Sequence, residues 1–187
     1  MLFRSANGID DSPVRGQPEE AKGYSNEITL EDDVTTMEAA QTILLALADS
    51  VTRHMRSDNA KAGCISVSIR YLDFKTRSHQ ISLPEPVDTS REVYETAKML
   101  LKELWKDRQP LRLMGIALTN LTRDSYGQQM SLFSPAGQKD RERDEKLDRT
   151  MDELKKKFGS DIVQRGSVMS LGLSVARKYK GKEDSNL

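Results

Sequence analysis

Hydrophobic residues at positions 24–121 follow two different periods, and the change from one period to the other predicts six elements. Alternating apolar and polar residues predict a strand with one buried face, whereas apolar residues that recur every three or four positions predict an amphipathic helix. In chain order, the expected elements are a strand at 24–31, a helix at 36–57, strands at 64–74 and 75–83, a helix at 89–107 and a strand at 111–121.

The ends of these elements carry recognisable signals. Both helices begin with a threonine that is followed three residues later by a glutamate, which is the capping-box pattern. The two pairs are Thr35 with Glu38 and Thr89 with Glu92. Pro84 and Pro86 are expected to close the strand at 75–83, because proline cannot donate a hydrogen bond to a neighbouring strand.

The strand at 75–83 has an irregular pattern. In an unbroken strand, cationic and apolar side chains would share one face, namely those of Lys75, Arg77, His79, Ile81 and Leu83. Either the near end of this face is exposed, or a bulge changes the phase of the strand.

The order strand, helix, strand, strand, helix, strand predicts an α+β fold of the βαββαβ type. Two right-handed crossovers place both helices on one face of a four-stranded sheet and leave the opposite face uncovered, unless another body meets it. The basic residues Arg70, Lys75, Arg77 and Arg112 lie on or beside the expected strands. This bare face is the first indication of a function.

An extra charged helix is expected over 140–158, with Gly159 at its end. Its apolar residues form a narrow stripe of Leu147, Met151, Leu154 and Phe158. Such a stripe needs a partner surface. A coiled-coil or dimer contact is one alternative for this helix, and a role in repair is the other.

Composition and charge limit the possible functions. The 187 residues include 36% hydrophobic and 31% charged residues, which suggests one domain with solvated ends. Basic and acidic residues both number 29, so a nucleic-acid partner must be held by local charges and backbone amides. The single cysteine, Cys64, and the lack of a long apolar run or signal peptide predict a cytoplasmic protein with no membrane contact.

Catalytic motifs are not found in the sequence: it has no recognisable Ser/His/Asp set, phosphate-cradling glycine loop or metal-ligand cluster. The two histidines, His54 and His79, are interpreted as surface residues rather than as bases. A small stand-alone enzyme therefore lacks candidate catalytic residues.

Two segments are candidates for binding. In the first, Lys75, Thr76, Arg77, Ser78 and His79 can contact phosphates without reading base sequence, although an ordinary solvated hairpin has the same pattern. The second is Gln129-x-x-Leu132-Phe133, where two large apolar side chains occupy a polar stretch and can anchor in a partner's pocket. Alternatively, Leu132 and Phe133 cover the end of the chain's own sheet.

Several ordered segments resemble the C-terminal region of Y-family DNA polymerases of the DNA polymerase IV and ImpB/MucB/SamB type, over roughly 6–165. The matching segments are Ala6 to Val14, Lys22 to Glu27, Asp73 to Thr76, Leu83 to Pro86, Leu113 to Ile116, Gln129 to Phe133, and Lys146 to Gly159. The resemblance implies a little finger domain that lays its sheet along the DNA backbone, followed by a motif that docks on the ring-shaped sliding clamp.

The resemblance also implies roles for single residues. At DNA, backbone amides are expected to act at Ser25, Asn26 and Glu27, and side chains at Lys75, Thr76, Arg77, Ser78, His79 and Arg112. Gly115 would let the backbone come close to the DNA. The clamp would be bound by Gln129, Leu132 and Phe133. Leu113 and Ala117 stand where many relatives have basic residues, and Ser25 replaces a common glycine. The grip on DNA is therefore expected to be weaker or shifted.

The expected organisation has four parts: 1–22 as the end of the thumb and a linker, 23–122 as the little finger domain, 123–137 as a linker with the clamp motif, and 138–187 as a helix and polar tail. The partners implied are primer-template DNA, a sliding clamp, and the palm, fingers and thumb of the parent polymerase. Magnesium-binding carboxylates would lie in a palm preceding Met1, so no cofactor and no polymerase activity are expected in this fragment. A protein-interaction scaffold without DNA binding is the alternative function.

Overall fold

The computed structural model describes residues 7–8, 20–123, 138–160 and 162–169. The elements within them are β1 (Gly23–Val34), α2 (Met37–Ser57), β2 (Lys61–Tyr71), β3 (Thr76–Val87), α3 (Ser90–Leu104), β4 (Leu111–Thr122), α4 (Gln138–Phe158) and α5 (Gly166–Met169). The predicted element order, the α+β class and the extra C-terminal helix are confirmed. None of the described helices is long and apolar enough to span a membrane.

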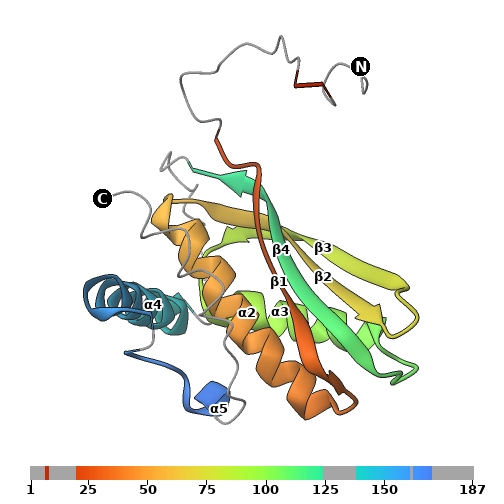
Figure 1. Ribbon diagram of the computed structural model, residues 1–187. Coiled ribbons are helices and arrows are strands. Elements are labelled where there is room, and N and C mark those ends of the chain that lie inside the picture. Colours follow the sequence, from red (N-terminus) through yellow and green to blue (C-terminus); the bar gives the residue numbers. More distant parts are fainter. Residues whose placement is uncertain (1–6, 9–19, 124–137, 161, 170–187) are drawn as a thin grey trace.

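The four strands form one antiparallel sheet in the order β1-β4-β2-β3. Helix α2 connects β1 to β2 across the intervening β4, and α3 connects β3 to β4 across β2. Both helices lie on the same face of the sheet, and α4 lies beyond them on the side away from the strands (Figure 1). Among the described elements, none covers the other face of the sheet (Figure 1). We call this face the open face.

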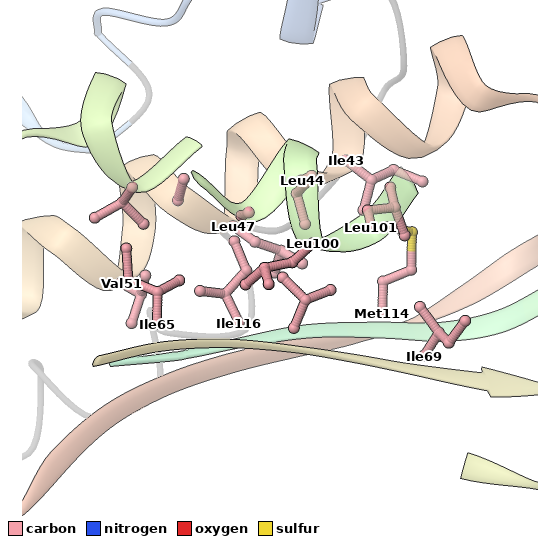
Figure 2. Packing of buried hydrophobic residues seen from close by; sticks show 14 of the residues in the cluster. Ile43, Leu44, Leu47, Val51, Ile65, Ile69, Leu100, Leu101, Met114 and Ile116 are labelled. Atoms are coloured by element: carbon pink, nitrogen blue, oxygen red, sulfur yellow. The ribbon is translucent and has the colours of Figure 1, made fainter. Parts of the chain in front are cut away.

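The core lies between the sheet and the two helices, where aliphatic side chains from both layers interdigitate (Figure 2). The labelled members are Ile43, Leu44, Leu47, Val51, Ile65, Ile69, Leu100, Leu101, Met114 and Ile116 (Figure 2). Each is at most 2% exposed. This apolar burial is the main stabilising contribution to the fold, because the hydrophobic effect scales with the apolar area removed from water.

One of the two predicted helix starts is confirmed, and the other is wrong by one residue. At α3, Thr89 accepts a hydrogen bond from the backbone N–H of Glu92 at 3.3 Å, and its hydroxyl donates to the Glu92 carboxylate at 2.6 Å. At α2, the N-cap is Thr36 rather than Thr35, and it accepts from the N–H of Ala39 at 3.3 Å. Strand β1 continues to the buried Val34, so the extended N-cap conformation falls one residue later than expected.

Strand β3 runs through Pro84 and Pro86 to Val87, so the predicted end of this strand was wrong. The strand tolerates both prolines because β3 is an edge strand and only one of its sides needs N–H donors. Its register with β2 is unbroken from Arg77, opposite Ile69, to Ser82. The near end of its irregular face is therefore exposed, and no bulge changes its phase there.

Helix α4 is held to the helix layer by charged and polar contacts. Arg56 of α2 is 10% exposed, and its guanidinium contacts Asp152 at 2.7 Å and Asp148 at 3.2 Å. Asp148 also accepts a hydrogen bond from the backbone N–H of Ser90, the first residue of α3, at 2.7 Å, and lies 3.6 Å from Arg165. This carboxylate therefore connects α4 with both helices of the layer.

Three of the four residues of the predicted apolar stripe of α4 are exposed and do not supply this contact, whereas Met151 is half-buried, so the need of the stripe for a partner surface stays a prediction. Leu147 is 50% exposed, Leu154 37% and Phe158 58%. Asp148 and Asp152 face the helix layer instead. Each of them directly follows a residue of the stripe, and they lie one helical turn apart. The reason is that α2 presents a buried guanidinium at this place, and a guanidinium requires acceptors rather than apolar side chains.

Candidate nucleic-acid interface

The strand register fixes which side chains lie on the open face. Successive residues of a strand point to opposite faces, so the alternates of the core residues belong to the open face. Across the order β1, β4, β2, β3, its three central rows are Ser25-Ala117-Ser66-Gln80, Glu27-Gly115-Ser68-Ser78 and Thr29-Leu113-Arg70-Thr76. Most of these side chains are small, and many carry a hydroxyl group. The open face is therefore a surface of short side chains that can both donate and accept hydrogen bonds.

The positive charge of this region gathers at one end of the sheet, beside the turn between β2 and β3. Arg70 lies in the last central row, and its Nε donates to the Thr76 hydroxyl at 3.0 Å. Lys75 follows in the turn, with a side chain 78% exposed and its Nζ 2.8 Å from Asp73. The hydrogen bond and charge of Lys75 hold the pKa of the Asp73 carboxyl below its usual value.

Arg112 completes this cationic end because of a local irregularity in β4. Leu113 pairs with Arg70 while Leu111 pairs with Tyr71, so Arg112 is the extra residue of a β-bulge. A bulge re-aims the side chain it carries. The Arg112 guanidinium lies over the ring of Phe74, 5.3 Å from its centroid.

The predicted cluster at 75–79 is divided by the strand's period of two. Thr76 and Ser78 lie on the open face, whereas Arg77 and His79 point to the side of the helices. Arg77 contacts Asp107 at 3.4 Å, and His79 contacts Glu103 at 3.0 Å. Both basic side chains therefore have an acidic partner within the chain, away from the open face.

The predicted residues of β1 are divided in the same way. Ser25 and Glu27 lie on the open face, whereas the side chain of Asn26 is 6% exposed on the covered side, level with Ile116. Since β1 is an edge strand, half of its backbone N–H groups point away from the sheet and can donate to a ligand.

The packing of the sheet explains why position 115 is a glycine, which the sequence alone did not reveal. A Cβ at this position would lie 2.8 Å from the hydroxyl oxygen of Ser68 and 3.1 Å from the Cβ of Glu27. The neighbouring strands therefore fill the space beside this glycine. Its immediate role is to let three strands approach closely, and the expected approach of DNA at this glycine stays a prediction.

The residues predicted at DNA did not include several open-face residues, namely Thr29, Ser66, Ser68, Arg70 and Gln80. The alternation in β2 already separates three of them from the core, but only the register of the neighbouring strands brings all five onto one surface. The predicted clamp-binding residues Gln129, Leu132 and Phe133 lie outside the described residues.

Comparisons with known proteins agree on one family. The model of the impB/mucB/samB family C-terminal domain matches residues 21–132. Among curated proteins, DNA polymerase IV of Clostridium acetobutylicum is 36% identical over 169 residues, which cover 90% of this chain and 41% of the relative. DNA polymerase IV of Dehalococcoides mccartyi strain CBDB1 is 33% identical, over 91% of this chain and 42% of the relative. The chain thus spans about two fifths of the length of these relatives.

Solved structures share the fold at lower sequence identity. An insertion ternary complex of Dbh DNA polymerase matches with a TM-score of 0.50 and 18% identity, over 66% of this chain and 35% of that one. A Y-family DNA polymerase chimera that contains Dbh matches with a TM-score of 0.52 and 19% identity over the same shares. The sheet and its two helices are therefore an arrangement already known from polymerase structures.

Proposed function

The chain belongs to the impB/mucB/samB family, as the C-terminal little finger region of a Y-family DNA polymerase, and from this premise we propose that it holds primer-template DNA by its backbone and tethers the polymerase to a sliding clamp. The observation that carries the proposal is the open face, which has hydroxyl groups along its length and cations at one end.

The chemistry of the open face suits phosphates rather than bases. Hydroxyl groups and edge-strand N–H groups donate to phosphate oxygens, and such contacts position a duplex without reading its sequence. Arg70, Lys75 and Arg112 supply the positive charge. The rest of the open face adds no positive charge, because Glu27 in the middle row is acidic and Ala117 and Leu113 are neutral. Binding is therefore independent of sequence and depends on a small number of phosphate contacts.

The rest of the polymerase is also part of the proposal. The two relatives described above carry the name DNA polymerase IV and are more than twice as long as the matched part. The chain works beside a palm domain that contains the Mg²⁺-binding carboxylates, together with fingers and a thumb, in synthesis past damaged bases. Residues 1–187 contribute DNA and clamp binding to this polymerase.

The DNA contact is tested by titrating the protein with a fluorescent duplex at several salt concentrations. The logarithm of the affinity falls by about 0.9 per neutralised phosphate for each tenfold increase in salt. Lys75→Ala with Arg112→Ala is expected to reduce this slope by roughly 2. Lys98→Ala with Lys102→Ala on α3 removes the same charge from the helix side and is expected to leave the slope unchanged.

Two results would count against the DNA contact. A titration of the unaltered protein that is flat in salt removes backbone binding and leaves the interaction scaffold. Equal losses in the two double variants show that net charge matters and that the cationic end of the open face does not.

The clamp contact is tested separately by a pull-down with a purified sliding clamp. Leu132→Ala with Phe133→Ala removes the two apolar anchors of the Gln129-x-x-Leu132-Phe133 pattern and is expected to abolish clamp binding with DNA affinity nearly intact. Leu147→Ala with Phe158→Ala, an equivalent exposed pair on α4, is the control. Clamp binding that survives the first double variant shows that the motif is assigned wrongly.

A further inference from the structure

The turn between β2 and β3 exposes an aromatic ring in an unusual backbone conformation. The side chain of Phe74 is 68% exposed, and Leu72 in the same turn is 46% exposed. Phe74 has a φ of +62°, a left-handed conformation that a bulky residue rarely adopts. Backbone strain of this kind persists where the surroundings enforce it, and it clusters at functional sites.

The turn that carries this ring is well fixed. The backbone N–H of Phe74 donates to the carbonyl of Tyr71 at 3.1 Å, and the N–H of Tyr71 donates to the carbonyl of Lys75 at 3.1 Å. The Asp73 carboxylate accepts from the N–H of Lys75 at 3.1 Å. The ring of Phe74 is therefore presented outward from a closed turn rather than from a loose loop.

The charges around the ring favour a polyanion. Arg70, Lys75 and Arg112 surround the turn with three positive charges, against one negative charge from Asp73. The acidic run at 31–33 lies in the β1 bulge, level with Arg112 of β4, whereas Arg70 and Lys75 lie on the far side of β4, so the positive excess is on the side of β2 and β3. A negatively charged ligand would approach along that side, directly over Phe74.

We propose that Phe74 is a stacking platform for an unpaired nucleobase, in a single-stranded segment that continues from the duplex on the open face. Arg70, Lys75 and Arg112 then contact the flanking phosphates. The inference rests on the proposed DNA binding and extends it to a second form of the ligand. An aromatic ring with cations beside it binds single strands irrespective of sequence, because every base has a π-face.

The test compares two probes, a blunt duplex and the same duplex with a short single-stranded overhang. The unaltered protein is expected to bind the overhang probe more tightly. Phe74→Ala is expected to lose about 5- to 150-fold in affinity for that probe, the effect of removing one stacked base, and to keep its affinity for the blunt duplex. Phe158→Ala is the matched control, because Phe158 is also exposed and has a lysine, Lys157, 5.2 Å from its ring centroid.

A second variant separates stacking from a change in the turn. Phe74→Trp keeps a large aromatic side chain and is expected to keep the affinity for the overhang probe. The introduced indole adds emission above that of Trp105, which is 1% exposed and belongs to the hydrophobic core. Quenching of this added emission by the overhang probe, and not by the blunt duplex, supports direct stacking.

The outcomes distinguish this inference from the proposed function. Failure of the unaltered protein to bind the blunt duplex contradicts the proposed DNA binding itself. Normal duplex binding with no gain from the overhang overturns the stacking platform alone. Equal losses of Phe74→Ala on both probes also overturn it, because Phe74 then supports the duplex contact or the turn.

Discussion

The helix layer of α2 and α3 has two interfaces of opposite chemistry. Toward the sheet, it is packed by aliphatic side chains, such as Leu44 at 0% and Ile116 at 1% exposure. Toward α4, it is held by ionic contacts, with Arg56 at 10% and Asp148 at 6% side-chain exposure. The two interfaces exclude water to a similar degree at these positions, yet the groups that they bury have opposite preferences for water.

The difference concerns how each interface specifies its geometry. Apolar contacts are non-directional, so a core of the right volume tolerates many exchanges. A buried carboxylate must be met by donors, or it costs several kcal/mol, on the order of 3–5 for a pair that loses one partner. Asp148 has three partners from three segments, namely Arg56, the N–H of Ser90 and Arg165. We infer that the sheet interface supplies most of the stability, whereas the α4 interface fixes where one helix docks.

Leu44→Ala removes a buried side chain from the apolar interface and is expected to have the largest effect on the unfolding free energy. Removing a fully buried leucine side chain costs about 2–5 kcal/mol of unfolding free energy, measured by urea denaturation. The control is Met99→Ala on α3, where the side chain is 42% exposed, with an expected change below about 0.5 kcal/mol. Similar losses in the two variants would contradict the placement of the core.

Asp148→Asn attacks the ionic interface while conserving the volume of the side chain. The neutral amide weakens the contacts with Arg56 and Arg165, at a cost of about 1.5–3 kcal/mol for hydrogen bonds that involve charged groups. We expect faster protease cleavage within α4 and a smaller change in the urea transition than for Leu44→Ala. Asp140→Asn, in the exposed first turn of the same helix, is the control. Unaltered cleavage in Asp148→Asn would show that α4 is held by something else.

Added salt should separate the two interfaces without any substitution. Raising ionic strength from about 0.1 M to 1 M shortens the screening length from roughly 10 Å to 3 Å. The outer pairs of the α4 interface, such as Arg91 with Asp144 at 3.2 Å, are partly exposed and lose most of their modest contribution of below about 1 kcal/mol each. Amide exchange in α4 is expected to accelerate, with exchange in the buried part of α2 unchanged. Equal acceleration in both helices would argue against two separate interfaces.

The sheet interface could be predicted from the sequence, because burial leaves a periodic trace there. Ile65, Val67 and Ile69 alternate with polar residues, and the buried positions of α2 recur at helical spacing. The capping box at Thr89 was equally direct, since two side chains three residues apart complete it. Local rules of this kind failed where two residues were equally suitable, as with Thr35 and Thr36, and where prolines lie within an edge strand, as with Pro84 and Pro86.

The α4 interface could not be predicted in this way. An aspartate on a charged helix has the same pattern whether it faces water or a buried guanidinium, and only the position of Arg56 in space decides between them. The open face was predicted as a surface but not in its composition. Arg77 and His79 face away from it, and Arg70 and Arg112 belong to the neighbouring strands β2 and β4, whose register the sequence does not reveal.

The smallest effect is expected for Leu147→Ser with Leu154→Ser, which tests the apolar stripe of α4 directly. Because these side chains are already 50% and 37% exposed, replacing them removes little buried area, and each change should alter the unfolding free energy by less than about 0.5 kcal/mol. Protease cleavage of α4 should also stay as slow as in the unaltered protein, since Asp148 and Asp152 keep their contacts with Arg56. Rapid cleavage in this double variant would reverse the comparison, because α4 would then be held by its apolar side chains and the ionic contacts would be secondary.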